Sequence, residues 1–352
     1  MAFTESKTGK IGLYGVLLVA TIVAPFLFPN YSVQLATLWI FIIVAITWDM
    51  TGGQMGYNSL GNIFFYGTGM YAAAVVGIGL VYNVGDYTAA AGGGIYEFTV
   101  TQWMTGYLLG SLFAGVFCAI TAVILGYLFF GLRGPYFAIG TLGVAIAAGE
   151  LVSNWDWVGG GQGISLPIYP GDAGVGKNVI YFGFAAVGVV LFIFVKWLYS
   201  TRFGAAINAI RDDEEKAEAM GLQTLRYKLT AWAMSAFFVG VAGGMSGFQL
   251  GHFEPLETAY QTINLGIFMV VCVLLGGKGT LWGPIIGAVM FQIFKEVTWN
   301  YFLGWQWVAL GALIVVTVVY FQDGLMGWLM QKKPEWFGIR VEKKDDAAQT
   351  AQ

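Results

Sequence analysis

The sequence predicts an all-α polytopic protein that crosses a membrane about ten times. Charged residues make up 11% of the chain and apolar residues 57%, whereas about 25% of the residues in a soluble domain are charged. The apolar residues lie in long runs, and a membrane-spanning helix needs about 20 of them in succession. The 51 glycines lie among these runs, where small residues allow helices to approach closely.

The expected spans follow one another along residues 1–330, which we expect to form a single transmembrane domain. The first follows Lys7 and Lys10 and resembles the start of a signal peptide, but no Ala-x-Ala cleavage site follows, so we expect it to remain as a span. The polar tail at 331–352 has too few apolar residues to fold alone and is expected to be flexible. The spans are expected at 10–28, 32–50, 61–83, 103–131, 134–153, 179–198, 230–250, 262–276, 283–298 and 304–322.

The distribution of basic residues predicts the orientation. If the loop 199–229 faces the cytoplasm and the spans alternate, all of the 17 basic residues except Lys177 and Lys295 lie on the cytoplasmic side, as the positive-inside rule requires. Both termini are then cytoplasmic. The outer segments are acidic and aromatic, which suits either a docking surface for a soluble partner or an ordinary aromatic belt.

The loop 199–229 is the longest charged island between apolar segments, and two interpretations of it remain open. It is either a solvated loop that fixes orientation or a short docking helix for a soluble partner. Gly204 to Met220 has no proline and no internal glycine, which favours a helix. Asp212 and Lys216 would then pair at i,i+4.

An apolar face supports the helical interpretation of this loop. Ile207, Ile210, Ala217 and Gly221 fall near one face of such a helix. Gly221 also suits a C-terminal cap, because glycine adopts the left-handed conformation without strain.

The sequence lacks the residues that several classes of function require. The stretch Leu275–Thr280 is only faintly similar to a phosphate loop, because Lys278 is followed by glycine where serine or threonine is needed, so we expect no ATP binding. Two cysteines and one histidine, His252, provide no metal site. Ionisable residues are few in the spans and lie near their ends, which argues against an ion-driven carrier.

Three glycine-rich blocks with polar residues interrupt the apolar segments, at 52–71, 132–143 and 275–288. Such blocks permit unwound backbone or tight helix crossings, both of which suit a translocation path. Plain helix packing is the alternative, and physical grounds alone favour it slightly.

Together with a fourth block, these segments resemble the inner-membrane permease family of ABC importers for branched-chain amino acids, and most closely its larger, LivM-type subunit. The fourth block comprises Ser200–Gly204, Ala209–Glu214, Ala217–Gly221 and Tyr227–Lys228. The resemblance runs from about Trp48 to Leu325, and the four blocks stand in the family's order.

The resemblance implies a fold of two pseudo-symmetric halves and a non-catalytic subunit of a bacterial inner-membrane importer. The implied partners are a second homologous permease, two ABC ATPase subunits and a periplasmic substrate-binding protein, with ATP and magnesium on the ATPases and no cofactor or metal in this chain. The residues implied for ATPase coupling are Arg202, Gly204, Arg211, Glu215, Glu218 and Gly221. Those implied for the translocation path are Ser59, Gly61, Asn62, Tyr136, Thr141 and Gly143. A structural turn is implied at Gly276, Gly277, Gly279, Gly283 and Pro284.

Four departures from the family pattern concern the transported solute. One lies in the outer loop, where the family usually has Thr-Gly-Gly-x-x-Gly-Ile and this chain has Gly159-Gly-Gly-Gln162-Gly163-Ile164. Asn62 stands where the family commonly has histidine, Tyr57 where it often has glutamine, and Ile146 where it usually has glutamate, although Glu150 lies one turn later on the same face. A permease for urea or short amides is therefore the alternative to one for leucine, isoleucine and valine. A secondary transporter, a channel and a structural membrane protein are weaker alternatives.

Overall fold

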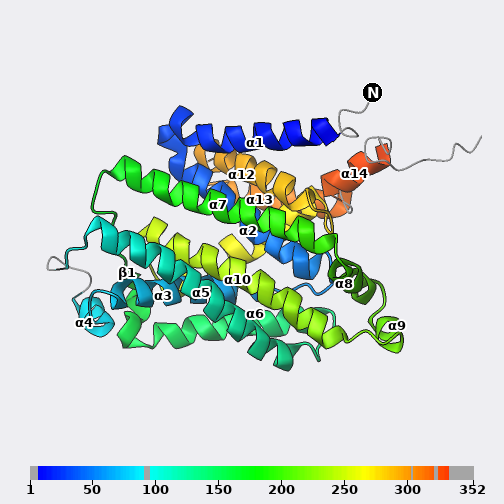
Figure 1. Ribbon diagram of the computed structural model, residues 1–352, viewed down its shortest axis with the longest axis horizontal. Coiled ribbons are helices and arrows are strands. Elements are labelled where there is room, and N and C mark those ends of the chain that lie inside the picture. The colour runs from blue at the N-terminus through cyan, green and yellow to red at the C-terminus, as the bar shows by residue number, and fades with distance from the viewer. Residues whose placement is uncertain (1–6, 91–95, 303, 321–323, 333–352) are drawn as a thin grey trace, which may run out of the picture.

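The computed structural model describes residues 7–90, 96–302, 304–320 and 324–332, and it is almost entirely helical (Figure 1). Helices occupy all ten predicted spans, and six of them are long and apolar enough to cross a membrane. The prediction of an all-α membrane protein is confirmed. The ten are α1 (Lys7–Leu27), α2 (Ser32–Gly52), α3 (Asn62–Gly79), α5 (Val100–Phe129), α6 (Pro135–Ser153), α7 (Ala173–Tyr199), α10 (Thr224–Leu250), α11 (Phe268–Gly276), α12 (Gly283–Tyr301) and α13 (Gln306–Tyr320).

Shorter elements connect these helices. The strands β1 (Ile164–Ser165) and β2 (His252–Phe253) pair antiparallel, and π-helical turns lead into α11. The remaining elements are η1 (Pro29–Tyr31), α4 (Val84–Ala89), η2 (Asp156–Val158), η3 (Gly160–Gln162), α8 (Arg202–Asp212), α9 (Glu214–Ala219), η4 (Pro255–Ala259), η5 (Thr262–Ile267) and α14 (Gly324–Lys332).

Local signals in the sequence fix where several helices begin. Thr99 and Gln102 form a capping box at the start of α5, which satisfies two backbone N–H groups that the first turn leaves free. Asp172 accepts hydrogen bonds from two backbone N–H groups at the start of α7. Proline stands in the first turn of α6 and of α12, where its missing N–H costs nothing.

The packing of the spans exchanges elements between the two halves of the chain. The second span, α2, packs against α11 and α12, while the seventh span, α10, packs against α3 and α5. The two sets of contacts correspond, because the second and seventh spans, the third and eighth, and the fourth and ninth each lie five apart in chain order. These contacts agree with two related halves, in which one helix of each half packs against helices of the other half.

Glycines allow the tightest of these crossings. A Cβ atom on Gly69 of α3 would lie 2.9 Å from the Cα atom of Gly240 on α10, and one on Gly110 of α5 would lie 2.8 Å from the carbonyl oxygen of Ala73. The backbones of α3, α5 and α10 therefore meet with no room for a side chain, as expected for helices that associate inside a membrane.

The molecule has two ends, and they differ in character. α8, α9, α14 and the start of α1 lie at one end, which we call the α8–α9 end, and α4 and β1 lie at the other (Figure 1). Unwound backbone between α2 and α3 is confined to residues 53–61, which is only part of the glycine-rich block at 52–71. The predicted tail at 331–352 begins inside α14, and its part after Lys332 lies outside the described residues.

Candidate functional site

The charged segment 202–221, which we call the docking segment, forms two helices. α8 ends at Asp212 and α9 begins at Glu214, with Asp213 in an extended conformation between them. The Asp213 side chain accepts a hydrogen bond from the backbone N–H of Lys216, so this residue caps the start of α9. The prediction of one continuous helix was therefore wrong, because a good capping residue breaks it.

The predicted apolar face of this segment lies against the bundle. Ile207, Ile210 and Ala217 are buried, and the segment contacts α7 and α10. A Cβ atom on Gly204 would lie 2.6 Å from the carbonyl oxygen of Tyr199. Only glycine therefore allows α8 to turn back this closely on the end of α7.

The end of α9 carries the predicted glycine cap. Gly221 adopts a positive φ of 88°, its N–H donates to the carbonyl of Glu218, and the N–H of Leu222 donates to that of Ala217. This is the Schellman arrangement. Gly221 was predicted to lie on the apolar face that packs against the bundle, but it is exposed. The cap leaves the Met220 side chain 87% exposed beside it.

Charged side chains cover the outer face of the docking segment. Arg202, Arg211, Glu215 and Glu218 are all exposed. The predicted pair between Asp212 and Lys216 does not form, because Lys216 bonds instead to Asp213 at 2.8 Å. Asp212 bonds to Arg211.

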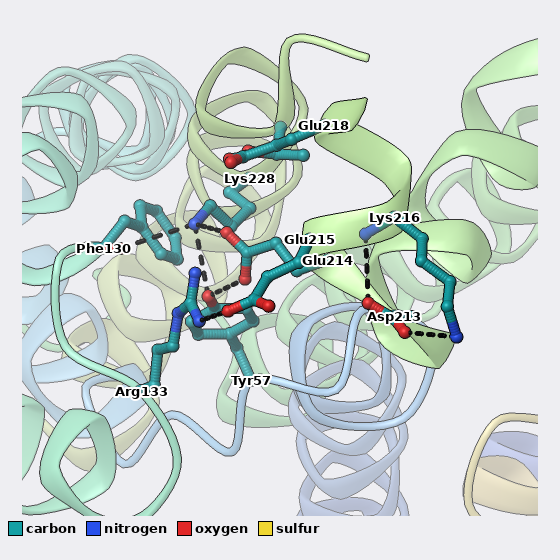
Figure 2. A network of polar contacts seen from close by, with 10 residues as sticks. Tyr57, Phe130, Arg133, Asp213, Glu214, Glu215, Lys216, Glu218 and Lys228 are labelled. Carbon is teal, nitrogen blue, oxygen red and sulfur yellow. Dashed lines mark hydrogen bonds and ion pairs between the residues drawn. The ribbon is translucent and has the colours of Figure 1, made fainter. Parts of the chain in front are cut away.

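A shielded polar network joins α9 to the rest of the molecule (Figure 2). The Nζ atom of Lys228 lies 2.6 Å from Oε1 of Glu214, and the two side chains are 4% and 14% exposed. The Tyr57 hydroxyl donates to the other carboxylate oxygen of Glu214 at 2.5 Å, and it accepts from Lys228 at 3.2 Å. The carbonyl of Phe130 accepts a longer hydrogen bond from Lys228. Three separate segments thus meet at one carboxylate.

Electrostatics favour the charged form of this carboxylate. Burial opposes ionisation, but hydrogen bonds from Lys228 and Tyr57 outweigh it and hold the pKa of Glu214 below its ordinary value. Burial and the bond to Glu214 raise the pKa of the Tyr57 phenol, so Tyr57 remains a donor at neutral pH. An exposed pair of 2.9 Å between Arg133 and Glu215 lies beside the network.

Tyr57 extends this network toward α6. Its ring makes edge contacts with Phe130 and Phe137, at centroid distances of 5.5 and 5.1 Å, and Phe137 belongs to α6. Three residues after Tyr57, the backbone N–H of Leu60 donates to the Thr141 hydroxyl on α6 at 3.1 Å. The 53–61 loop therefore connects the docking segment to α6 at two points.

The same loop and the last turn of α2 are tied to the turn between α11 and α12. The Asp49 carboxylate accepts from the N–H of Gly279 at 2.7 Å, and the Gln54 side chain donates to the Gly279 carbonyl at 2.7 Å. Lys278 donates to Asn58 at 3.1 Å. Gly276 and Gly277 lead into this turn, Gly277 and Gly279 have positive φ, and Gly283 and Pro284 open α12.

The six residues implied for the translocation path separate into two groups. Tyr136 and Gly143 lie on an exposed face of α6, and Tyr136 is 73% exposed. The remaining four are buried where α3 begins against α6 and α10: they are Ser59, Gly61, Asn62 and Thr141. Among these, both amide atoms of Asn62 lack a hydrogen-bond partner. The structure therefore places only Tyr136 and Gly143 on an open surface.

Sequence reasoning did not select Tyr57, Glu214 or Lys228 as site residues. One signal was available, because Lys228 is a basic residue two positions before an apolar span at 230–250. A charge so close to a span needs a partner when it is buried. Within the described residues, no group of three or more His, Cys, Asp or Glu side chains is placed to hold a metal ion.

The fold and this site define a multi-pass membrane protein with a charged segment docked on one end of its helical bundle. The family model of the branched-chain amino acid transport system permease component matches residues 31–319. The chain therefore belongs to that permease family.

Curated relatives agree with this membership. The chain is similar to the high-affinity branched-chain amino acid transport system permease protein LivM of Escherichia coli strain K12, at 28% identity over 92% of this chain and 76% of the relative. It is also similar to the LivM of Salmonella typhimurium strain LT2, at 28% identity over 88% and 73% of the two chains. The probable LivM of Methanocaldococcus jannaschii is 25% identical over 84% and 93%. No solved structure matches significantly.

Proposed function

We propose that this chain is the transmembrane permease subunit of an ATP-driven ABC importer for leucine, isoleucine and valine. The observation that carries the proposal is the docking segment, whose apolar face is held on the bundle while its charged face and Met220 remain exposed. A helix presented in this way suits insertion into a groove of a soluble partner. The names of the LivM relatives supply the substrate class.

In this proposal the docking segment lies in the cytoplasm and contacts an ABC ATPase subunit. Arg202, Arg211, Glu215 and Glu218 supply charged contacts around Met220. The chain itself is non-catalytic, and two ATPase subunits bind ATP and magnesium. The membrane is the bacterial inner membrane, and both termini are cytoplasmic, as the distribution of basic residues favours.

The exposed face of α6 is proposed to line the translocation path opposite a second, homologous permease. A Cβ atom on Gly143 would meet nothing within 4 Å, so this face has room for a neighbouring helix or a solute. Tyr136 lies at one end of this face, and Glu150, which is also exposed, lies near the other end. The buried group at Ser59, Gly61, Asn62 and Thr141 holds the start of α3 against α6. A periplasmic binding protein delivers the solute to the opposite, α4 end.

Uptake by a strain that lacks this gene tests the substrate. We expect the strain to lose ATP-dependent uptake of radiolabelled leucine, isoleucine and valine, and a plasmid copy to restore it. Loss of urea or short-amide uptake with unchanged leucine uptake would favour the alternative substrate. Uptake that persists in vesicles without ATP would indicate a secondary transporter or a channel instead.

A further inference from the structure

The ion pair between Lys228 and Glu214 differs from the other ion pairs among the described residues. Its two side chains are 4% and 14% exposed, whereas the three other pairs have side chains that are 37% to 83% exposed. Exposed pairs on a surface contribute little. A shielded pair with a third partner holds its groups in one geometry, because separating the two groups would leave buried charges with neither a partner nor water around them.

The network connects α9 to α6 through the 53–61 loop. A second link between them is the exposed pair between Glu215 of α9 and Arg133, which stands just before α6. Glu214 is the first residue of α9, Lys228 lies in the first two turns of α10, and Tyr57 belongs to the loop. A displacement of α9 therefore pulls on Tyr57 through a hydrogen bond of 2.5 Å. The ring contact between Tyr57 and Phe137 would transmit this displacement to α6.

Leu60 provides the second connection from this loop to α6. Its N–H donates to Thr141, one turn of helix after Phe137. Movement of the loop as a unit would therefore rotate or shift the part of α6 that carries Tyr136 and Gly143. α10 holds Lys228 while this happens, because α10 is packed against α3 and α5.

We propose that Glu214, Lys228 and Tyr57 are positioning residues that transmit movement of the docking segment to α6 during transport. This inference rests on the proposed function, since it assumes that an ATPase moves the docking segment. None of the three residues touches nucleotide in this scheme. They determine whether ATP hydrolysis and the state of the path change together.

The competing explanation is that the network only stabilises the fold. A buried ion pair replaced by apolar or neutral groups of similar size is often neutral for stability. The double variant Glu214→Gln with Lys228→Met therefore keeps the fold while it removes the charge-assisted link. Tyr57→Phe is milder still, because it removes one hydroxyl and keeps the ring packed on Phe130 and Phe137.

The test uses the complete importer, with both permeases and both ATPases in proteoliposomes and the liganded binding protein added outside. Assembly is measured by co-purification of the ATPases, and hydrolysis is measured with and without the binding protein. We expect both variants to assemble with normal basal hydrolysis and an unchanged ATP concentration for half-maximal rate. The stimulation by binding protein should fall about tenfold in Tyr57→Phe, the size expected on losing a hydrogen bond to a charged group.

Arg133→Gln is the matched control, because it breaks the neighbouring exposed pair with Glu215 and should leave stimulation unchanged. Full stimulation in Tyr57→Phe would overturn the proposal, whether or not the double variant assembles. Equal loss in Arg133→Gln would also overturn it, since the shielded network would then have no special role. A wild-type complex without any stimulation would instead refute the proposed function itself.

Discussion

Lys228 and Glu214 form a 2.6 Å ion pair between the start of α10 and the start of α9, and the same carboxylate accepts the Tyr57 hydroxyl. One side chain of the docking segment is thus fixed to two parts of the bundle at once.

Replacement of Gly204 by alanine should displace α8. The new methyl group would lie 2.6 to 2.9 Å from backbone atoms of Tyr199, and overpacking of this kind costs about 1–3 kcal/mol. We expect weaker binding of the ATPase subunits, measured by co-purification in detergent. Gly311→Ala on α13 is the control, because a Cβ atom there meets nothing within 4 Å. Equal ATPase recovery in both variants would contradict the tight fit at Gly204.

Replacement of Gly221 by proline should uncouple transport from ATP hydrolysis. Proline fixes φ near −65° and has no N–H, whereas Gly221 has a φ of 88° and donates to the Glu218 carbonyl. The end of α9 and the position of Met220 would both change. We expect normal membrane insertion but loss of leucine uptake, with hydrolysis that no longer responds to substrate. Gly221→Asn should retain most activity, because asparagine tolerates the left-handed conformation. Full uptake by the proline variant would favour the interpretation that 204–221 is a solvated segment without a role in docking.

Reversal of Arg211 to glutamate should weaken the docking segment in a different way. The new carboxylate would stand beside Asp212, which is the present partner of Arg211. The Arg211 side chain runs close to two glycines of the bundle, since a Cβ atom on Gly56 would lie 3.1 Å from its Cγ atom and one on Gly279 would lie 3.6 Å from its guanidinium. The shorter glutamate would not reproduce this packing. We expect reduced uptake at normal expression, measured with radiolabelled leucine. Arg211→Lys, which keeps the charge, should be less affected than Arg211→Glu; an equal loss would show that charge is not the cause.

The coupling that depends on Glu214 should be insensitive to pH above about 5.5. The pKa of Glu214 is lowered in the folded protein from an ordinary value of 4.5, so its contribution is complete above that value and is lost as pH falls through the folded-state pKa. We expect a constant ratio of stimulated to basal hydrolysis between about pH 5.5 and 8. A loss of the ratio centred near neutral pH, absent from Glu214→Gln, would contradict the depressed pKa.

Single cysteines at Asp172 and Ser200 should react with a membrane-impermeant reagent from opposite sides of the membrane. The two residues flank α7, and 27 helical residues span about 40 Å. We expect labelling of position 172 in intact spheroplasts, and of position 200 only after the membrane is opened. Labelling of both positions from the outside would refute the orientation.

Most of the fold followed from patterns that are local in the sequence. Runs of apolar residues predicted all ten spans, and the glycine at 221 predicted the end of α9. The break at Asp213 is also local, because its side chain accepts from the backbone N–H of Lys216 and pairs with the Lys216 ammonium. Competition between a cap and a continuing helix is settled by small energy differences, which a sequence pattern does not resolve.

The candidate site was harder to predict because its contacts are distant in sequence. Tyr57 and Glu214 are 157 positions apart, and nothing in either local pattern indicates the other. The path residues illustrate the same difficulty. Thr141 and Gly143 are two positions apart on α6, yet one is buried and the other exposed, because the packing of α3 and η4 decides which side of α6 is covered.

The central claim is that the docking segment contacts an ATPase, and Met220 offers the most direct test of it. A photo-crosslinking residue at position 220 should capture the ATPase subunit in membranes that contain the complete importer, because this side chain is 87% exposed at the tip of α9. The same residue at position 172, beyond the opposite end of α7, should capture no ATPase. Absence of an ATPase adduct at position 220, in a complex that still transports leucine, would contradict the account.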